Sequence, residues 1–218
     1  MSLLFNTIPT ITELSTLQDV KTTLFHPDLT FAAKDFIVEG LSVEKVSFPQ
    51  LRIINGSIIN KSNILEEIEL PEMVEGGYRD QGDNRVRTLL LDKVRVLHEL
   101  DLTGEKTNLN KVSLQSIEYC VGIRLPEKSP NLKTFIFGPN LKQYGKNYRD
   151  GFITATNCLD QLSINNILMS FAALDGTNGT VEFANRMVVL TGNAATPGIR
   201  GLAAIKVLQR RGCTVITN

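Results

Sequence analysis

The chain has 218 residues, and its 23 basic and 23 acidic side chains give a formal net charge of zero. A chain of this length with 42% hydrophobic residues can bury a substantial core, so we expect a folded protein. The balanced charge excludes the basic footprint of a general nucleic-acid binder and gives no attraction to an acidic membrane surface. Nucleic acid is therefore not an expected partner.

The N-terminus does not predict an export signal. Its first ten residues contain no basic side chain, and Asn6 and Pro9 interrupt the apolar run, whereas a Sec signal peptide has a basic start and a longer apolar segment. The longest apolar stretch, residues 167–174, is well short of the roughly 18 residues that cross a membrane. Three cysteines are too few for a disulfide framework and are expected to be reduced thiols. We expect synthesis in a cytoplasm without Sec secretion, and no membrane insertion.

Residues 1–35 lack the repeat that follows them. Residues 12–20 combine a capping-type start with apolar side chains on one helical face, which predicts a short helix. The remaining apolar side chains are scattered and have little around them to form a core. We therefore interpret this part as an attachment segment that docks onto a partner protein or a second copy of the chain. The candidate attachment residues are Leu3, Leu4, Phe5, Ile8 and Ile11.

From residue 36 onward a short pattern repeats. Five segments each place two apolar residues at i and i+2 before a Pro, Gly or Thr; they span residues 44–52, 65–74, 97–105, 119–128 and 132–142. Counted from the second apolar residue, their spacings are 22, 32, 23 and 12, and the spacing of 32 contains a polar insertion at residues 76–85. The next match, Phe183, lies two units of 23 beyond Phe137.

A period of about 22–23 residues with one short strand in each unit is typical of a leucine-rich-repeat-like solenoid. Such a strand offers only two inward side chains, so the units must stack to share a core. An antiparallel sandwich of short strands is the alternative, but a Pro directly after the second apolar residue favours strands that stop abruptly at a solenoid corner. We predict an α/β fold, an irregular leucine-rich-repeat-like solenoid with a mainly parallel sheet.

This frame predicts which side chains point inward and which form an exposed ladder on the sheet, since alternate residues of a strand face opposite sides. The inward residues are Val46, Phe48, Ile68, Leu70, Leu100, Leu102, Ile123, Leu125, Phe135, Phe137, Val181 and Phe183. The exposed sheet face, our candidate interaction surface, consists of Ser47, Glu69, Asp101, Arg124, Ile136 and Glu182.

The C-terminal part of the chain, from residue 159 onward, follows a different pattern. Residues 162–174 have helical periodicity with Ser163 as the expected cap, and residues 180–183 are expected to form a strand. A second helix, residues 199–211, ends before Gly212, and residues 213–218 form a closing strand. These helix–strand units would extend the parallel sheet and cap it. The predicted organisation is an attachment segment (1–35), a solenoid (36–158) and C-terminal capping units (159–218).

Part of the repeat region resembles a known repeat family. Residues 131–146 (NLKTFIFGPNLKQYGK) and 64–73 (ILEEIELPEM) are similar to the BspA-type leucine-rich repeat, in which a short strand is followed by a Pro or Gly turn. The similarity covers about residues 40–145. It implies the same solenoid that the spacing predicts.

The tail, residues 159–218, resembles the C-terminal module of many tailed-phage virion proteins. That module combines a Leu…Asn-x-Ile-Leu segment, an Asn-Gly-Thr strand start, a Thr-Gly-Asn-Ala-Ala-Thr-Pro-like loop, an Ala-rich helix, Arg-Gly and a closing Thr-Val-x-x-Asn. The matching residues are Leu162, Asn166, Ile167, Leu168, Asn178, Gly179, Thr180, Thr191, Gly192, Asn193, Ala194, Ala195, Thr196, Pro197, Arg211, Gly212, Thr214, Val215 and Asn218. The resemblance implies a virion component.

The sequence offers few candidates for chemistry. The two histidines, His26 and His98, are far apart in the chain, and no nucleophile elbow is present. No His/Cys pair has metal-ligand spacing. Residues 80–84 carry oxygen side chains around a Gly but lack the distal Glu of an EF-hand, which favours a solvated loop. Residues 192–198 lack a phosphate-binding fingerprint. We expect no catalysis, cofactor or metal.

Two functional hypotheses follow. The first is a non-enzymatic structural component of a tailed-bacteriophage virion, such as a tail fibre, baseplate or capsid-attached protein, located in the virion after synthesis in the host cytoplasm. Its partners would be other virion proteins, copies of itself and a host cell-surface molecule. The alternative is a bacterial surface leucine-rich-repeat adhesin or ligand-binding protein. The N-terminus, which lacks a signal peptide, favours the virion component.

Overall fold

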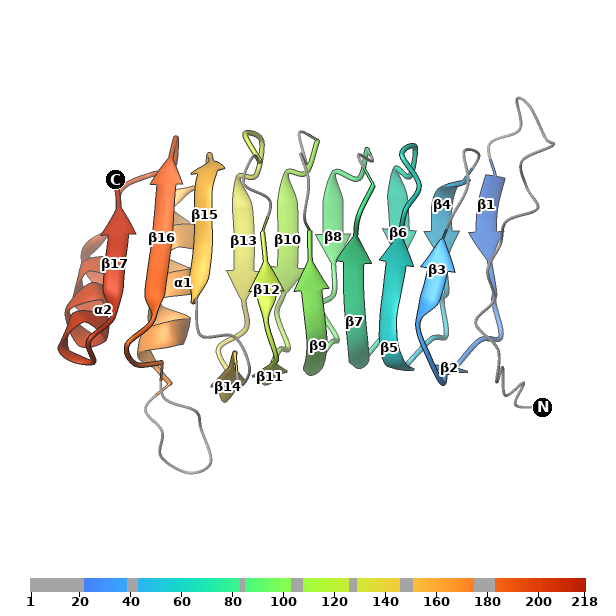
Figure 1. The fold of residues 1–218 in the computed structure, drawn as a ribbon, viewed down its shortest axis with the longest axis horizontal. Helices are drawn as coiled ribbons and strands as arrows, with labels where there is room; N and C mark the ends of the chain where they lie inside the picture. The colour runs from blue at the N-terminus through green and yellow to red at the C-terminus, as the bar shows by residue number, and fades with distance from the viewer. Residues whose placement is uncertain are drawn as a thin grey trace.

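The chain winds into a solenoid whose two walls of parallel strands face each other across one core (Figure 1). The computed structural model describes residues 22–38, 43–82, 85–102, 108–125, 129–145, 151–174 and 183–218. Within these ranges every strand pairing is parallel. The predicted irregular solenoid with a mainly parallel sheet and C-terminal helix–strand units is confirmed.

Each turn contributes one strand or broken strand to each wall. The first wall contains β1 (Thr22–Phe25), β4 (Val43–Ser47), β6 (Glu67–Glu69), β8 (Thr88–Leu90), β10 (Lys111–Leu114) and β13 (Thr134–Phe137). The second wall contains β2 (Phe31–Ala32), β3 (Phe36–Val38), β5 (Ile53–Asn60), β7 (Glu75–Asp80), β9 (Val96–Asp101), β11 (Tyr119–Cys120), β12 (Ile123–Arg124) and β14 (Gln143–Tyr144).

One corner between the walls carries a chain of backbone hydrogen bonds from turn to turn. Each amide donates to the carbonyl one turn earlier, at 2.7–3.0 Å, through Thr30, Arg52, Val74, Arg95, Glu118 and Lys142. The step from Arg95 to Glu118 is 23 residues and the step from Glu118 to Lys142 is 24 residues, and the earlier steps are of similar length. Each turn therefore takes nearly the same length of chain and contains two strands.

The expectation of one strand per unit is wrong. Leu100 and Ile123 are paired on the second wall, whereas Phe48 continues the β4–β6 register of the first wall. The spacings of 32 and 12 arose because strands from opposite walls were placed in one frame. The expected insertion at residues 76–85 is also corrected, since β7 occupies residues 76–80 of it.

The predicted core is largely confirmed. Ile68 and Leu125 are partly buried against it, and Val181 lies outside the described residues. The fully buried members of the prediction are Val46, Phe48, Leu70, Leu100, Leu102, Ile123, Phe135, Phe137 and Phe183. Residues of both walls are among them, because successive side chains of each strand point alternately into and away from the core.

The N-terminal boundary of the solenoid lies earlier than residue 36. β1 pairs with β4 and β2 pairs with β5, so residues 22–32 already belong to the two walls. The helix expected at residues 12–20 and the five attachment candidates lie outside the described residues.

At the C-terminal end, helices replace the strands of the first wall. β15 (Phe152–Asn157), β16 (Met187–Gly192) and β17 (Thr214–Thr217) continue the second wall, while α1 (Gln161–Ala172) and α2 (Ile199–Arg210) lie behind them (Figure 1). α2 ends as predicted, with Gly212 at φ +80°. Of the strand expected at residues 180–183, residues 180–182 lie outside the described ranges. Phe183 is a buried core residue that precedes β16.

The residue expected to cap α1 has another role. Asp160, not Ser163, is the N-cap, and its carboxylate accepts from the Ser163 amide at 2.8 Å. The buried Ser163 hydroxyl instead accepts from the Phe135 amide at 3.0 Å. Asn166 completes the junction, since its Oδ1 accepts from Phe137 N (2.7 Å) and its Nδ2 donates to Phe137 O (3.1 Å). These side chains hydrogen-bond to backbone N–H and C=O groups at the edge of β13 that has no neighbouring strand.

We expect Asn166→Ala to destabilise the protein by about 1–3 kcal/mol, because it removes both hydrogen-bond partners of the Phe137 backbone at a part-buried site. Denaturant unfolding measures the change. Met169→Ala is the matched control, since Met169 lies on the exposed side of the same helix and should change stability by less. An Asn166→Ala protein as stable as the parent would show that this junction contributes little.

Glu118, at the corner, yields a pH prediction. Its carboxylate accepts from Arg95 Nε at 2.6 Å and from Lys142 Nζ at 2.9 Å, and these hydrogen bonds lower the pKa of Glu118 from 4.5 to about 2. A lowered folded-state pKa adds stability above pH 4.5, and this contribution is lost as the pH falls toward 2.

The carboxyl carbon-13 shift of Glu118 should therefore titrate with a midpoint near 2. Arg95→Ala should raise that midpoint, whereas Lys93→Ala, which removes a cation paired with Glu72 instead, should leave it unchanged. A midpoint of 4.5 in the parent protein would contradict the bridge.

Candidate functional site: a polar furrow on the second wall

The six residues predicted as one exposed sheet face do not form one surface. Ser47, Glu69 and Ile136 lie on the first wall. Asp101 and Arg124 lie on the second wall, in register with each other. Glu182 lies outside the described residues. The predicted interaction face is thus divided between opposite sides of the solenoid.

Two of these residues are also less exposed than expected. Ser47 is 4% exposed and Asp101 is 8% exposed, although both alternate with inward residues. The Ser47 hydroxyl donates to Glu69 Oε2 at 2.8 Å, and Asp101 Oδ2 lies 3.5 Å from Arg124 Nη1. Long neighbouring side chains one turn away cover the short ones. Glu69 and Ile136 are partly exposed, and Arg124 is exposed.

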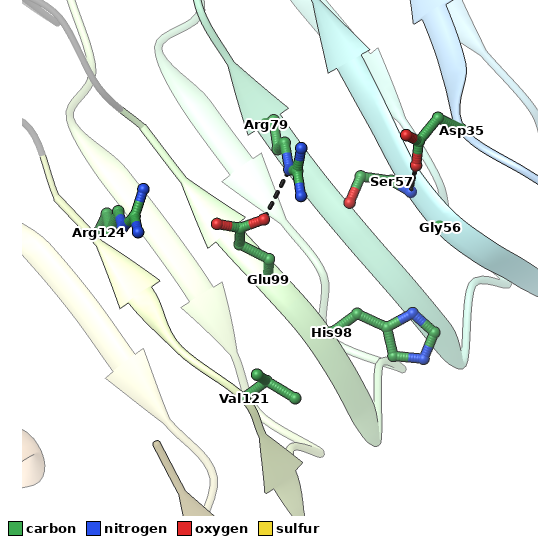
Figure 2. Close-up of a pocket in the computed structure, with 8 residues that line it drawn as sticks. All are labelled: Asp35, Gly56, Ser57, Arg79, His98, Glu99, Val121 and Arg124. Carbon is green, nitrogen blue, oxygen red and sulfur yellow. Dashed lines mark hydrogen bonds and ion pairs between the residues drawn. The ribbon is translucent and has the colours of Figure 1, made fainter. Parts of the chain in front are cut away.

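A furrow of about 540 Å³ crosses the outer face of the second wall. We define it by Asp35, Gly56, Ser57, Arg79, Glu99 and Arg124, with His98 and Val121 at one side (Figure 2). These residues come from successive turns: the β2–β3 break, β5, β7, β9 and the β11–β12 segment. The furrow therefore follows the solenoid axis across five turns.

The furrow lies where the strands of the second wall are irregular. β2 and β3 are separated by residues 33–35, and β11 and β12 by residues 121–122. Between these breaks, β5 and β7 shift register between Ile53 and Ser57, and β7 and β9 shift between Gly76 and Tyr78. Irregularities at the same height on successive turns lower the surface along one line.

Gly56 in the furrow, and Gly77 beside Ser57 on the next turn, lie where neighbouring turns approach each other closely. A Cβ at Gly77 would collide with Ser57 Oγ and lie 3.1 Å from the carbonyl oxygen of Glu99, and a Cβ at Gly56 would collide with Asp35 Oδ1. Asp35 Oδ1 also accepts from the Ser57 amide at 2.8 Å. Only glycine leaves room for this close approach of neighbouring turns.

Paired charges line the furrow. Arg79 Nε donates to Glu99 Oε2 at 2.6 Å (Figure 2), and Arg124 lies against Asp101. His98 Nε2 lies 3.1 Å from Glu75 Oε1 at the edge. Guanidinium and carboxylate groups therefore alternate along the surface, and each cation has an anion from an adjacent turn.

The histidines and the buried thiol lie in separate environments. His26 packs against the rings of Phe36 and Phe48, with centroids 6.4 and 5.7 Å away, so the two histidines belong to different environments. The Cys120 thiol is buried, and desolvation raises its pKa. Such a thiol is a poor nucleophile.

The sequence suggested a solvated loop at residues 80–84, but Asp80 is not part of one. It ends β7 and is buried, and it accepts from Asn60 Nδ2 and from the Tyr78 hydroxyl, both at 3.2 Å.

No group of three His, Cys, Asp or Glu side chains that could hold a metal ion occurs among the residues described. Within the same ranges, none of the helices combines the length and apolar character that spanning a bilayer requires.

Of the furrow residues, only Arg124 was predicted from the sequence as part of a surface, and His98 was expected to belong to no site. A signal was present, since Arg79, Asp101 and Arg124 recur at the period of one turn and are paired in register. The adjacent glycines at 76 and 77 were a second signal, because glycine inside a strand marks a bulge.

Comparisons of the chain with protein-family models, with curated proteins and with solved structures found no match. The site is therefore interpreted from its own geometry.

The burial of the thiols gives a prediction. Cys120 and Cys213 are buried and Cys158 is partly exposed, so a thiol reagent should modify Cys158 in the native protein and all three cysteines after denaturation. Mass spectrometry of labelled peptides identifies the reactive site. Labelling of native Cys120 as fast as Cys158 would contradict the described packing.

Proposed function

We propose that this protein is a non-enzymatic structural component of a tailed-bacteriophage virion, such as a tail fibre, baseplate or capsid-attached protein. The observation that carries the proposal is the C-terminal motif, whose order and spacing resemble a module of such proteins. Several of the described motif residues also bond to one another, which supports treating them as a module.

Polar motif residues make hydrogen bonds between separate segments of the C-terminal part. Asn218 Nδ2 donates to the carbonyls of Gly192 and Ala194, both at 2.8 Å, and thereby ties the chain end to the loop after β16. Arg211 Nη1 donates to Leu174 O at 2.5 Å, across the interval between the two helices. A spacing that serves such hydrogen bonds is restricted by geometry, which makes a chance resemblance harder to explain.

Aromatic packing joins this C-terminal part to the repeats. Phe171 and Phe183 stack with centroids 4.4 Å apart, and Phe171 lies 5.4 Å from Phe137 of the last first-wall strand. Tyr144 lies 4.8 Å from Phe171. The repeats and the cap therefore share one core, which suits a stiff structural element.

A binding or structural role fits the surface better than catalysis. In the furrow, Glu99 accepts a hydrogen bond from Arg79 Nε at 2.6 Å, and Arg124 lies beside Asp101. This row of paired charges suits a surface that hydrogen-bonds to a partner. The proposed partners are other virion proteins or copies of this chain, together with a host cell-surface molecule. Residues 1–20, which contain the five attachment candidates, are the proposed docking segment.

A bacterial surface adhesin or ligand-binding protein is the second candidate. The BspA-type resemblance and the furrow would suit it equally. The two functions place the protein in different locations, so they can be separated directly.

We expect antibodies against the chain to label tailed particles by immunogold electron microscopy, and we expect mass spectrometry to find the chain in gradient-purified particles. A variant that lacks residues 1–20 should retain its thermal unfolding transition but no longer enter the particles. Label on bacterial surfaces in cultures without particles would instead favour the adhesin. If the deletion variant enters particles normally, the attachment surface must lie on the solenoid walls instead.

A further inference from the structure

We propose that the furrow binds a neutral, linear glycan. The inference deepens the proposed function by naming the ligand class of this surface, and it rests on that function only for the idea that the surface meets a host polymer. Binding itself is argued from the furrow's shape, charge balance and hydrogen-bonding groups.

The shape favours an extended ligand. Asp35, Ser57, Arg79, Glu99 and Arg124 come from five successive turns. With strands about 4.8 Å apart, four steps span roughly 19 Å. The furrow has a volume of about 540 Å³, is lined by residues of all five turns and is open to the outside. A chain molecule lying along the solenoid axis would touch every turn, whereas a compact ligand would use only one or two.

The charge balance argues against a polyanion. Arg79 is paired with Glu99 at 2.6 Å, and Arg124 lies 3.5 Å from Asp101. Asp35 adds a further carboxylate. With two guanidinium and three carboxylate groups in or beside the furrow, the local field does not attract phosphate or sulfate groups. A neutral ligand avoids the cost of displacing these ion pairs.

The hydrogen-bonding groups suit hydroxyls. Each sugar hydroxyl both donates and accepts, so it can lie between a guanidinium N–H and a carboxylate oxygen. Arg124 and Arg79 keep 52% and 40% of their side-chain surface exposed, and Glu99 keeps 12%. Donors and acceptors therefore reach the surface side by side, held in place by the neighbouring turns.

Apolar ligands fit less well. Val121 is the one large apolar side chain among the lining residues described, whereas sites for lipids and apolar peptides are mostly apolar.

The test uses the full chain and isothermal titration calorimetry with neutral hexasaccharides: cello-, malto-, manno-, xylo- and chitohexaose. At least one should bind with a dissociation constant of about 1 mM or below, while a hexamer of galacturonic acid and a heparin hexasaccharide should bind more weakly. Arg124→Ala should weaken binding about tenfold or more, because a hydrogen bond to a charged group is lost.

Arg85→Ala is the matched control. Arg85 is similarly exposed and pairs across turns with Glu66, but it lies outside the furrow. Its removal should change the affinity less than twofold. Val121→Phe provides a second test, since it fills the furrow without altering charge and should abolish binding. Thermal unfolding of each variant separates loss of the fold from loss of the site.

Three results would overturn the inference: no binding of any neutral hexasaccharide, stronger binding of the anionic ones, or equal affinity in the Arg124→Ala and Arg85→Ala proteins. Failure of this test would leave the virion assignment unaffected, because that assignment is tested by location. Furrow-dependent glycan binding by a chain that is absent from particles would retain this inference and favour the bacterial surface protein.

Discussion

Backbone hydrogen bonds between successive turns set the geometry of this solenoid. A parallel strand satisfies its amides and carbonyls only when its neighbours are in register. Each strand within the walls has those neighbours one turn before and one turn after it in the chain. The corner ladder through Arg52, Val74 and Arg95 therefore restricts each turn to nearly the same number of residues.

The same constraint creates a problem at the end of a wall, where the last strand has an open edge. Here the chain changes from strand to helix, and Ser163 and Asn166 supply side-chain partners to the backbone of β13. Large aromatic rings fill the wider space that a helix requires beside a sheet. In the cap, side-chain hydrogen bonds take the place of those that a neighbouring strand would make to β13. Aromatic rings fill the larger distance between helix and sheet.

Register also explains why a furrow can extend over several turns. A bulge in one strand displaces the hydrogen-bonding groups of its neighbour, so irregularities recur at the same height in β5, β7 and β9. Side chains one turn apart then lie beside one another, which is how Arg79 meets Glu99 and Arg124 meets Asp101. Ion pairs between turns are a direct result of the repeat length.

The solenoid, its period, the two C-terminal helices and most of the core can be predicted from the amino-acid sequence. These features depend on local alternation, helical periodicity and a regular repeat length. The sequence alone could not determine which wall a strand joins, because inward–outward alternation is identical in both walls. Leu70 and Leu102 look equivalent in the sequence, yet β6 and β9 lie on opposite sides of the core. Only the pairing of strands decided that Ser47 and Asp101 lie apart and are covered, and that Asp35, Arg79 and Glu99 meet in one furrow. The physical reason is that burial and proximity on the outer face depend on side chains one turn away, which the local sequence does not identify.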